Sequence, residues 1–392
     1  MAGIYLHIPF CKRRCIYCDF YSTTGSNLTE DYVSALILEL KLRRMEITEK
    51  INTIYLGGGT PSQLTAQQIN KLITEIYSCF EVDQQAEITI EANPDDISEE
   101  WLDGIANSGV NRISLGIQTF NEKELTFLKR RHTGKQAINA VKTCQKHGFK
   151  NMSIDLIYGL PHQDLQDWQN NIDIALDLNI QHLSAYALIY EENTLLWRMK
   201  QKREVSEAND EYSLEMFETL IKKLTASGFE HYEISNFALP GFYSRHNSSY
   251  WQDIPYLGCG ASAHSYDGNN RKYNKPNLSL YLEGINTWHQ YGTPNVSFFE
   301  TEHLSKCEKY NDRIITSLRT CWGLNLKKLE KDFGKDFLNY CLQMATPHFK
   351  NKTLQIIPNQ TDHSQSILKL TQKGIFLSDG IMSDLLYIDE QI

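Results

Sequence analysis

Residues 11–18 read CKRRCIYC and place Cys11, Cys15 and Cys18 on one short loop with C-x3-C-x2-C spacing. The loop directly follows Ile4–Ile8, an apolar segment typical of a β-strand. Three thiolates on one loop suit three corners of a cube-shaped [4Fe–4S] cluster, whose fourth iron then stays open to another ligand. A structural zinc site with four ligands is the alternative, with His7 available as the fourth. The spacing favours the open cluster.

The sequence beyond this loop alternates between strand-like and helix-like segments. Apolar or β-branched segments typical of strands are Ile4–Ile8, Ile51–Leu56, Glu87–Ile90, Arg112–Leu115, Ser153–Ile157 and His182–Ala187. Helical patterns fall between them at Glu30–Arg44, Ala66–Cys79, Glu99–Ser108, Lys135–His147 and Leu165–Leu178. This alternation predicts an α/β fold, a partial (β/α)6 barrel with its chemistry at the C-terminal ends of parallel strands.

The pattern changes after residue 190. Asp210–Ser227 predicts one amphipathic helix, and residues 228–280 predict loops and short strands over a site. Helical patterns return at Ser305–Arg319, Leu326–Phe333 and Lys335–Phe349, followed by strand-like Leu354–Ile357 and Ile367–Leu370 and then Gly374–Ser378. We therefore predict a core over residues 1–190 with cluster and cofactor sites, a barrel extension over 191–290, and a smaller, mainly helical, winged-helix-like domain over 300–392.

Composition narrows the class of protein. The 392 residues are 41% apolar and 22% charged, as in ordinary globular proteins. A net charge of -9 gives no reason to expect a nucleic-acid partner. No apolar run approaches the ~20 residues that span a bilayer, and the N-terminus does not resemble a secretory signal. Nine cysteines is an odd number, and those outside the loop are scattered singly, which indicates a reducing compartment and predicts a cytoplasmic location.

A glycine-rich loop follows the second predicted strand. Residues 57–61 read GGGTP, and Gly58, Gly59 and Thr60 are candidate ligand contacts. Glycines at the end of a strand allow the backbone to approach a ligand closely. By itself the loop is equally typical of a tight turn. Because it follows the cysteine loop by one βα unit, it indicates a binding site.

Further polar side chains stand near the ends of predicted strands. Glu91 ends the third strand, Gln118 follows the fourth, and Asp155 lies on the fifth. Arg130 ends the helical stretch after the fourth strand. Each alone is also typical of a helix cap or a satisfied buried polar group. Together they are candidate ligands at the top of a barrel.

The cysteine and glycine motifs together resemble those of the radical S-adenosylmethionine superfamily. The resemblance implies that the open iron chelates the amino nitrogen and carboxylate oxygen of S-adenosylmethionine. One electron from the cluster then cleaves a carbon–sulfur bond to give a 5′-deoxyadenosyl radical. Residues that match positions around this cofactor in the coproporphyrinogen-oxidase-like branch are Glu91, Gln118, Arg130 and Asp155, with Tyr5 matching a residue beside the sulfonium.

Within that branch the chain resembles two groups over nearly its whole length, the oxygen-independent coproporphyrinogen III oxidases and the HemW-type heme chaperones. Where the oxidases have a fourth cysteine, this chain has Phe20. The oxidases also carry a longer N-terminal segment, whereas only ten residues precede Cys11 here. Residues 246–251 read HNSSYW and match the HNxxYW motif of the chaperones. All three features favour the chaperone.

The HNxxYW segment makes His246 a candidate axial ligand of heme iron. Tyr250 and Trp251 add flat apolar area that can stack on a porphyrin. The alternative is a loop histidine in ordinary hydrogen bonds, with the two aromatic rings filling the core. Other histidines that can serve as ligands are His132, His162, His231 and His264.

The resemblance implies a heme chaperone that binds heme and delivers it to heme-requiring, respiratory proteins, and it leaves open whether S-adenosylmethionine is cleaved. The rival function is an oxidase that decarboxylates coproporphyrinogen III. Its tetracarboxylate substrate requires basic contacts, for which the available residues are Arg13, Arg14, Arg245 and Arg271. The client protein, the heme stoichiometry and the oligomeric state are not specified by these motifs.

Overall fold

The computed structural model describes residues 1–25, 27–358 and 366–388. Its centre is a run of parallel strands that pair in chain order. They are β1 (Ala2–Ile8), β4 (Ile51–Gly58), β5 (Val82–Ala92), β6 (Arg112–Gln118), β7 (Met152–Tyr158) and β8 (His182–Ala187). Each of the six predicted strands coincides with one of them, so the predicted α/β barrel fold is confirmed.

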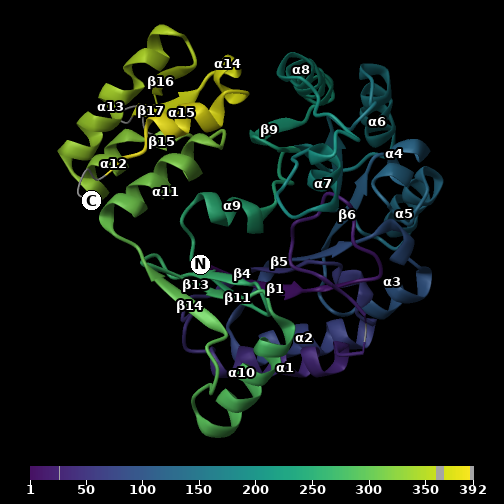
Figure 1. Cartoon of the computed structure of the whole chain (residues 1–392). Helices are drawn as coiled ribbons and strands as arrows, with labels where there is room; N and C mark the ends of the chain where they lie inside the picture. The colour runs from purple at the N-terminus through teal and green to yellow at the C-terminus, as the bar shows by residue number, and fades with distance from the viewer. Residues whose placement is uncertain (26, 359–365, 389–392) are drawn as a thin grey trace.

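Helices connect these strands and cover the outside of the sheet (Figure 1). They are α1 (Thr29–Leu42), α2 (Ala66–Cys79), α3 (Glu99–Ile105), α4 (Glu122–Phe127), α5 (Gly134–Lys146) and α6 (Leu165–Asp177). Thr65 and Thr133 begin α2 and α5 with complete capping boxes, in which the hydroxyl accepts from the N3 backbone N–H. The apolar face of each helix packs on strands such as β1, whose residues are almost all buried.

Both edges of the parallel sheet are extended, giving twelve strands in one sheet among the described residues. Beside β1 lie β11 (Tyr256–Cys259), β12 (His264–Tyr266), β13 (Asn270–Asn274) and β14 (Phe299–His303). Beside β8 lie β10 (Asn236–Ala238) and β9 (Glu230–Glu233). Strand β11 is parallel to β1, and the strands outside β11 and β8 are antiparallel. The barrel is therefore open, and its extension carries the second half of the chain.

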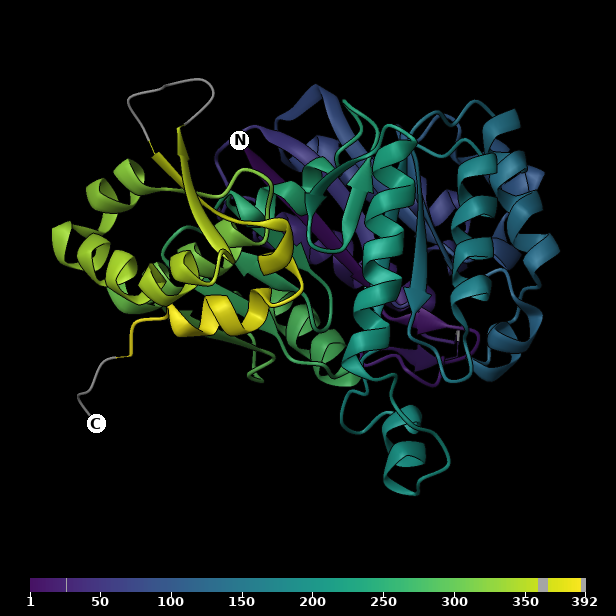
Figure 2. The ribbon, with the colours of Figure 1, turned by 90° about the horizontal axis from the view of Figure 1, so that it is seen from above.

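Four helices belong to this extension. They are α7 (Leu195–Gln201), α8 (Asp210–Ala226), α9 (Arg245–Trp251) and α10 (Leu278–Tyr291). Helix α8 confirms the amphipathic helix that the sequence predicts. Helix α7 lies in a stretch of polar sequence where none is expected, and in Figure 2 it protrudes beside the end of α8. Thr194 starts it by accepting a hydrogen bond from the Trp197 backbone N–H.

The C-terminal part forms its own hydrophobic core, to the upper left in Figure 1. Its elements are α11 (Lys306–Leu318), β15 (Leu324–Asn325), α12 (Leu326–Phe333), α13 (Lys335–Lys350), β16 (Leu354–Pro358), β17 (Ser366–Leu370), α14 (Gln372–Ile375) and α15 (Ser378–Asp384). The three strands pair in the order β15-β17-β16, which agrees with the predicted winged-helix-like arrangement. The strand-like reading of residues 374–378 is wrong, because Thr371 caps α14 through the Gly374 N–H.

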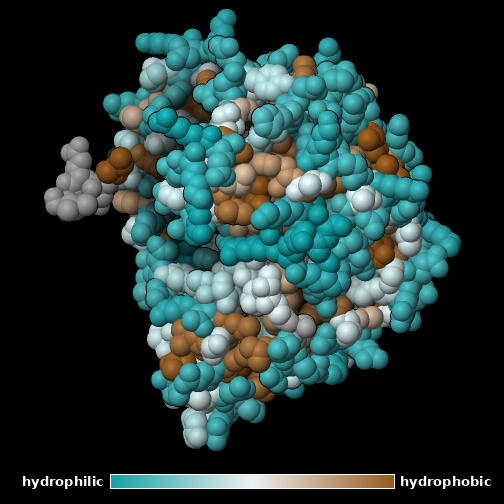
Figure 3. All heavy atoms as spheres, turned by 45° about the vertical axis from the view of Figure 1, so that its right-hand side comes forward, coloured by the Kyte–Doolittle hydropathy of each residue, from teal (hydrophilic) through white to brown (hydrophobic). Residues whose placement is uncertain are grey.

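The face shown in Figure 3 is mostly hydrophilic, with hydrophobic side chains gathered near the middle and at the lower left. No helix in the described ranges combines the length and the apolar composition that crossing a membrane requires.

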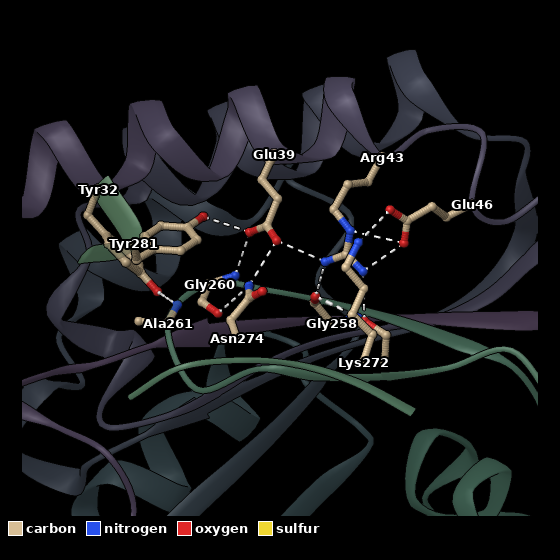
Figure 4. A network of polar contacts seen from close by, with 11 residues as sticks. Tyr32, Glu39, Arg43, Glu46, Gly258, Gly260, Ala261, Lys272, Asn274 and Tyr281 are labelled. Atoms are coloured by element: carbon tan, nitrogen blue, oxygen red, sulfur yellow. Dashed lines mark hydrogen bonds and ion pairs between the residues drawn. The ribbon is translucent and has the colours of Figure 1, made fainter. Parts of the chain in front are cut away.

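A buried ion pair at the C-terminal end of α1 is the centre of a polar network that joins α1 to the edge extension (Figure 4). The carboxylate of Glu39 accepts a hydrogen bond from Arg43 at 2.8 Å, and both side chains are 1% exposed or less. The Arg43 guanidinium also donates to the backbone oxygen of Gly258 at 2.7 Å. Glu39 further accepts hydrogen bonds from Asn274 and from the Tyr281 hydroxyl. Because buried charges require partners, this network fixes β11 and β13 against α1.

Candidate functional site

The three-cysteine loop is closed at its base by two short paired strands. Strand β2 (Phe10–Cys11) pairs in parallel with β3 (Thr23–Thr24), so the loop leaves and returns at the same point. Within the loop the backbone N–H of Cys18 donates to the oxygen of Cys15 at 3.4 Å and forms a turn. All three cysteines are half-buried and free of disulfides. The sequence thus brings all three to one loop beside one cavity.

The middle of this loop is anchored by the segment that contains α7. The Leu196 N–H donates to the oxygen of Ile16 at 2.9 Å. Ile16 is buried and shares a small hydrophobic core with Tyr190 and Leu196. Sequence reasoning missed this contribution because the segment is polar overall. The signal was present in Thr194, a capping residue directly before the apolar pair at 195–196.

One cavity of about 410 Å³ opens beside the loop, a size within the roughly 300–1,000 Å³ range of small-molecule sites. All three cysteines line it. The residues predicted to bind S-adenosylmethionine, other than Tyr5, line it too. These are Gly58, Gly59, Thr60, Glu91, Gln118, Arg130 and Asp155. Most come from four neighbouring parallel strands, β4 to β7, and the loop after β4, as expected for a barrel-top site, whereas Arg130 lies in the link between α4 and α5.

The glycine loop passes too close to its neighbours to carry side chains. Gly58 has a φ of +107°, and a Cβ there would lie 2.5 Å from the His7 ring. A Cβ on Gly59 would lie 2.8 Å from the Ile8 oxygen and 3.2 Å from the Cys11 sulfur. The absence of side chains therefore keeps the loop beside the cysteines and leaves its backbone facing the cavity.

We expect Gly58→Val to weaken S-adenosylmethionine binding by roughly tenfold or more, because the valine combines backbone strain of about 1–3 kcal/mol with a clash against the His7 ring that displaces the glycine loop. Equilibrium dialysis with the cluster-loaded protein measures this affinity. Gly148→Val is the matched control, since Gly148 also has a positive φ, +87°, but nothing lies within 4 Å of a Cβ there. Unaltered affinity in Gly58→Val shows that the loop does not contact the cofactor.

Two acidic side chains face the same cavity. Burial raises the pKa of Glu91 to about 7, and nearby Asp155 adds to the rise although Tyr55 hydrogen-bonds the carboxyl. Burial also raises the pKa of Asp155 to about 6. The Glu91 carboxylate accepts from the Tyr55 hydroxyl at 2.7 Å and from the Gly58 N–H at 3.1 Å. Two desolvated carboxyls in one cavity suit a ligand with cationic groups, such as a sulfonium and an ammonium.

Arg130 connects the cavity to the cysteine loop. Its guanidinium donates to the Cys15 sulfur at 3.3 Å and to Asn93 at 2.6 Å, and it also donates to the Gly116 oxygen. Its Nε is buried without a partner among the described residues. A fixed positive charge here stabilises an anionic cluster or a ligand carboxylate.

Gln118 lies beside this charge at a β-bulge between β6 and β7. Its φ of +73° is unusual for a residue other than glycine. This backbone conformation turns the end of β6 at the cavity wall. A positive φ in a residue other than glycine is strained, and such strain is typical of functional sites.

The cysteine loop fits an iron–sulfur cluster by its chemistry. The Cys11 sulfur lies 3.2 Å from the Thr60 hydroxyl, and burial raises the pKa of Cys18 to about 11. Burial also raises the pKa of Cys11, so a metal that binds these two thiols must displace their protons. In the described ranges no three His, Cys, Asp or Glu side chains gather around a single-ion position. A cluster instead binds its thiolates at separate corners, so spaced cysteines suit it.

His7, the candidate fourth ligand of the zinc alternative, is already engaged. Its Nε2 lies 2.9 Å from the Tyr21 backbone oxygen and its Nδ1 lies 3.1 Å from the Tyr5 hydroxyl. It is 4% exposed, and burial lowers its pKa to about 4. In this arrangement His7 supports the glycine loop.

A second cavity, of about 620 Å³, adjoins the first. Asp19 and Phe20 line both cavities, so the residue in place of the oxidases' fourth cysteine stands between them. Tyr5, Tyr250 and Trp251 line only this second cavity. Tyr5, expected beside the sulfonium, thus lies outside the cavity lined by the other predicted cofactor residues.

His246 lies behind this cavity, not in it. It is 1% exposed, with its Nδ1 at 2.9 Å from the Thr53 hydroxyl and its Nε2 at 2.8 Å from the Tyr250 hydroxyl. Burial lowers its pKa to about 3. In this conformation neither ring nitrogen is free to bind iron, so the geometry does not support His246 as the heme ligand. It positions Tyr250 instead.

Comparison with known proteins agrees with this geometry. The family model described as "Radical SAM superfamily" matches residues 5–175, which include the cysteine loop and the barrel strands β4 to β7. The structure of the Escherichia coli coproporphyrinogen III oxidase HemN, described as a radical SAM enzyme, superposes with a TM-score of 0.81. The two chains are 23% identical, covering 98% of this chain and 90% of HemN, which establishes a shared fold. Fold and site together define a radical SAM protein.

Curated relatives narrow this class. "Heme chaperone HemW" of Lactococcus lactis is 35% identical over 98% of this chain and 97% of its own length. HemW of Bacillus subtilis is 33% identical over 98% of this chain and 99% of its own length. HemW of Escherichia coli is 36% identical over 67% of this chain. The chain belongs to the HemW family.

Proposed function

We propose that this protein binds heme and delivers it to heme-requiring acceptor proteins. The observation that carries the proposal is the near full-length similarity to proteins named heme chaperones. The second cavity supports it, because tyrosines and a tryptophan form much of its wall and a porphyrin is a flat, largely apolar ligand.

The first cavity is proposed to hold a [4Fe–4S] cluster on Cys11, Cys15 and Cys18 and S-adenosylmethionine beside it. The chemistry that these groups supply when bound is one-electron cleavage of the cofactor. The protein's own residues bind and orient them. Glu91 and Asp155 provide negative charge toward the cationic groups of the cofactor, and Arg130 provides positive charge toward the cluster.

The oxidase alternative requires basic side chains that converge on a tetracarboxylate, and the four arginines considered for this role lie apart. Arg13 and Arg14 line the first cavity, whereas Arg271 lines the second. Arg245 lines neither cavity, and it donates to the Gln85 backbone oxygen at 2.6 Å. This arrangement favours a heme carrier over coproporphyrinogen decarboxylation.

Anaerobic incubation of the cluster-loaded protein with coproporphyrinogen III, S-adenosylmethionine and a strong reductant tests the choice. Porphyrin products are followed by chromatography, with a coproporphyrinogen oxidase as the positive control. We expect no decarboxylated product from protein with a full, reducible cluster. Product formation at the rate of the positive control makes the chain an oxidase and contradicts the proposal.

The acceptors are proposed to be respiratory proteins, and the working compartment is proposed to be the cytoplasm, since the scattered cysteines are free thiols in the structure.

A further inference from the structure

The second cavity contains a histidine that lies outside the HNxxYW motif. His264 is the first residue of β12, its side chain is exposed, and its ring stacks on Tyr273 at 5.5 Å between centroids. Within the described ranges its ring nitrogens have no hydrogen-bond partner. The other histidine that lines the cavity, His7, has both nitrogens engaged. Of the two histidines that line this cavity among the described residues, His264 is therefore the one with a ring nitrogen available to a metal.

We infer that the second cavity is the heme site and that His264 supplies the axial ligand of the heme iron. This inference rests on the heme-carrier function proposed above and adds the residue that holds the iron. A neutral imidazole is a common axial ligand of heme, and partial desolvation beside Tyr273, with the nearby charge of Arg271, lowers the pKa of His264 and favours the neutral ring.

Aromatic side chains from three separate parts of the chain form the walls around His264. Tyr250 and Trp251 come from α9, Tyr256 and Tyr266 from β11 and β12, and Phe20 from the cysteine loop. Tyr256 packs edge-on against Tyr250 at 4.6 Å, so the rings form one continuous surface. Such a surface buries a porphyrin plane without requiring hydrogen bonds to it. The volume of about 620 Å³ lies inside the roughly 300–1,000 Å³ range of cofactor sites.

The cavity also provides for the carboxylates of heme. Arg271 lines it with a guanidinium that forms ion pairs with Asp312 and Glu302. A guanidinium has five N–H donors, so Arg271 can donate to a further carboxylate at the cavity edge, although Asp19, Asp253 and Asp312 also line the cavity. Trp251 also lines the cavity, and its indole N–H is buried without a hydrogen-bond partner in the described part of the chain.

His264 stands on a rigid support, as a metal ligand requires. A Cβ on Gly258 would lie 1.9 Å from the His264 backbone oxygen, so only glycine permits this close approach. The next residue, Ser265, accepts a hydrogen bond from Arg43 at 3.0 Å and another from the Gly258 N–H at 3.0 Å. The buried network of Figure 4 therefore holds the strand that presents His264.

Heme titration of the full chain, followed by absorbance, tests this inference. His264→Phe keeps the stacking on Tyr273 but removes the ligating nitrogen. We expect it to weaken heme binding by about tenfold or more and to shift the Soret band. His289→Phe is the matched control, because His289 is exposed on α10 and does not line the cavity. In His264→Ala, added imidazole is expected to restore the spectrum of the native complex.

The outcomes separate the inference from the proposed function. A native chain that binds heme and a His264→Phe variant with the native affinity and spectrum overturn the site. Loss of affinity without a spectral change, and without rescue by imidazole, also overturns the ligand role. A native chain that binds no heme contradicts the heme-carrier function itself. Near-native circular dichroism in each variant keeps the comparison valid.

Discussion

Cys15→Ala is expected to remove the iron–sulfur cluster completely. The loop offers three thiolates to a cluster, and two rarely hold a cubane whose fourth iron has no protein ligand. Cys15 is also the cysteine whose sulfur accepts a hydrogen bond from Arg130, so its loss uncouples the loop from the buried guanidinium. Iron and sulfide content, with the visible absorption of the anaerobically reconstituted protein, measures the effect.

Cys307→Ala is the control for this variant. Cys307 is also a half-buried free cysteine, but it lies on α11 in the C-terminal part and far from the loop in sequence. We expect it to retain the native cluster content. A native cluster content in Cys15→Ala contradicts the assignment of the loop.

Glu39→Ala is expected to lower the free energy of unfolding by about 3–5 kcal/mol, because it leaves the Arg43 charge buried without its fully buried partner. The same change removes the acceptor for Asn274, for the Tyr281 hydroxyl and for the Gly260 N–H. Urea unfolding of the cofactor-free chain, followed by circular dichroism, measures the loss as a shift of the midpoint.

Glu46→Ala provides the comparison for this loss. Glu46 also pairs with Arg43, at 2.8 Å, but its side chain is 37% exposed. Because Glu46 is partly exposed and Arg43 keeps its buried partner Glu39 in this variant, we expect a smaller loss than in Glu39→Ala. An equal loss of stability in the two variants contradicts the claim that the buried partner of Arg43, Glu39, makes the larger contribution to stability.

The barrel could be predicted from the sequence because each parallel strand is a run of apolar residues. Segments such as Ile51–Gly58 are buried on nearly every residue, and the helices between them carry capping signals that the structure retains. The residues within each segment therefore determine these strands and helices. The same holds for the cysteine loop, whose three ligands lie close together in the sequence.

The sequence predicts an extension with short strands, but not the bounds or the pairing of those strands, because they are short and polar. Strand β13 reads NRKYN, a composition typical of a loop, and it forms where tertiary contacts such as the Glu39–Asn274 hydrogen bond support it. These contacts join residues more than 200 positions apart. No pattern within a short stretch of sequence predicts these contacts.

Which histidine binds heme iron could not be predicted from the sequence either. A motif places His246 near two aromatic rings, but the sequence does not reveal that Thr53 and Tyr250 occupy both nitrogens of its imidazole. It also lists His264 among several histidines without ranking them. Only the cavity, formed by α9, β11, β12 and the cysteine loop, distinguishes an available nitrogen from one already bonded.

Heme delivery is the central claim, and transfer to an acceptor tests it most directly. Membranes from heme-starved cells, whose respiratory enzymes lack heme, are incubated with the heme-loaded full chain or with the same concentration of free heme. Heme-dependent electron transfer is then measured. The account predicts faster recovery of activity with the loaded protein than with free heme. Recovery no faster than with free heme contradicts the proposal that the chain delivers heme.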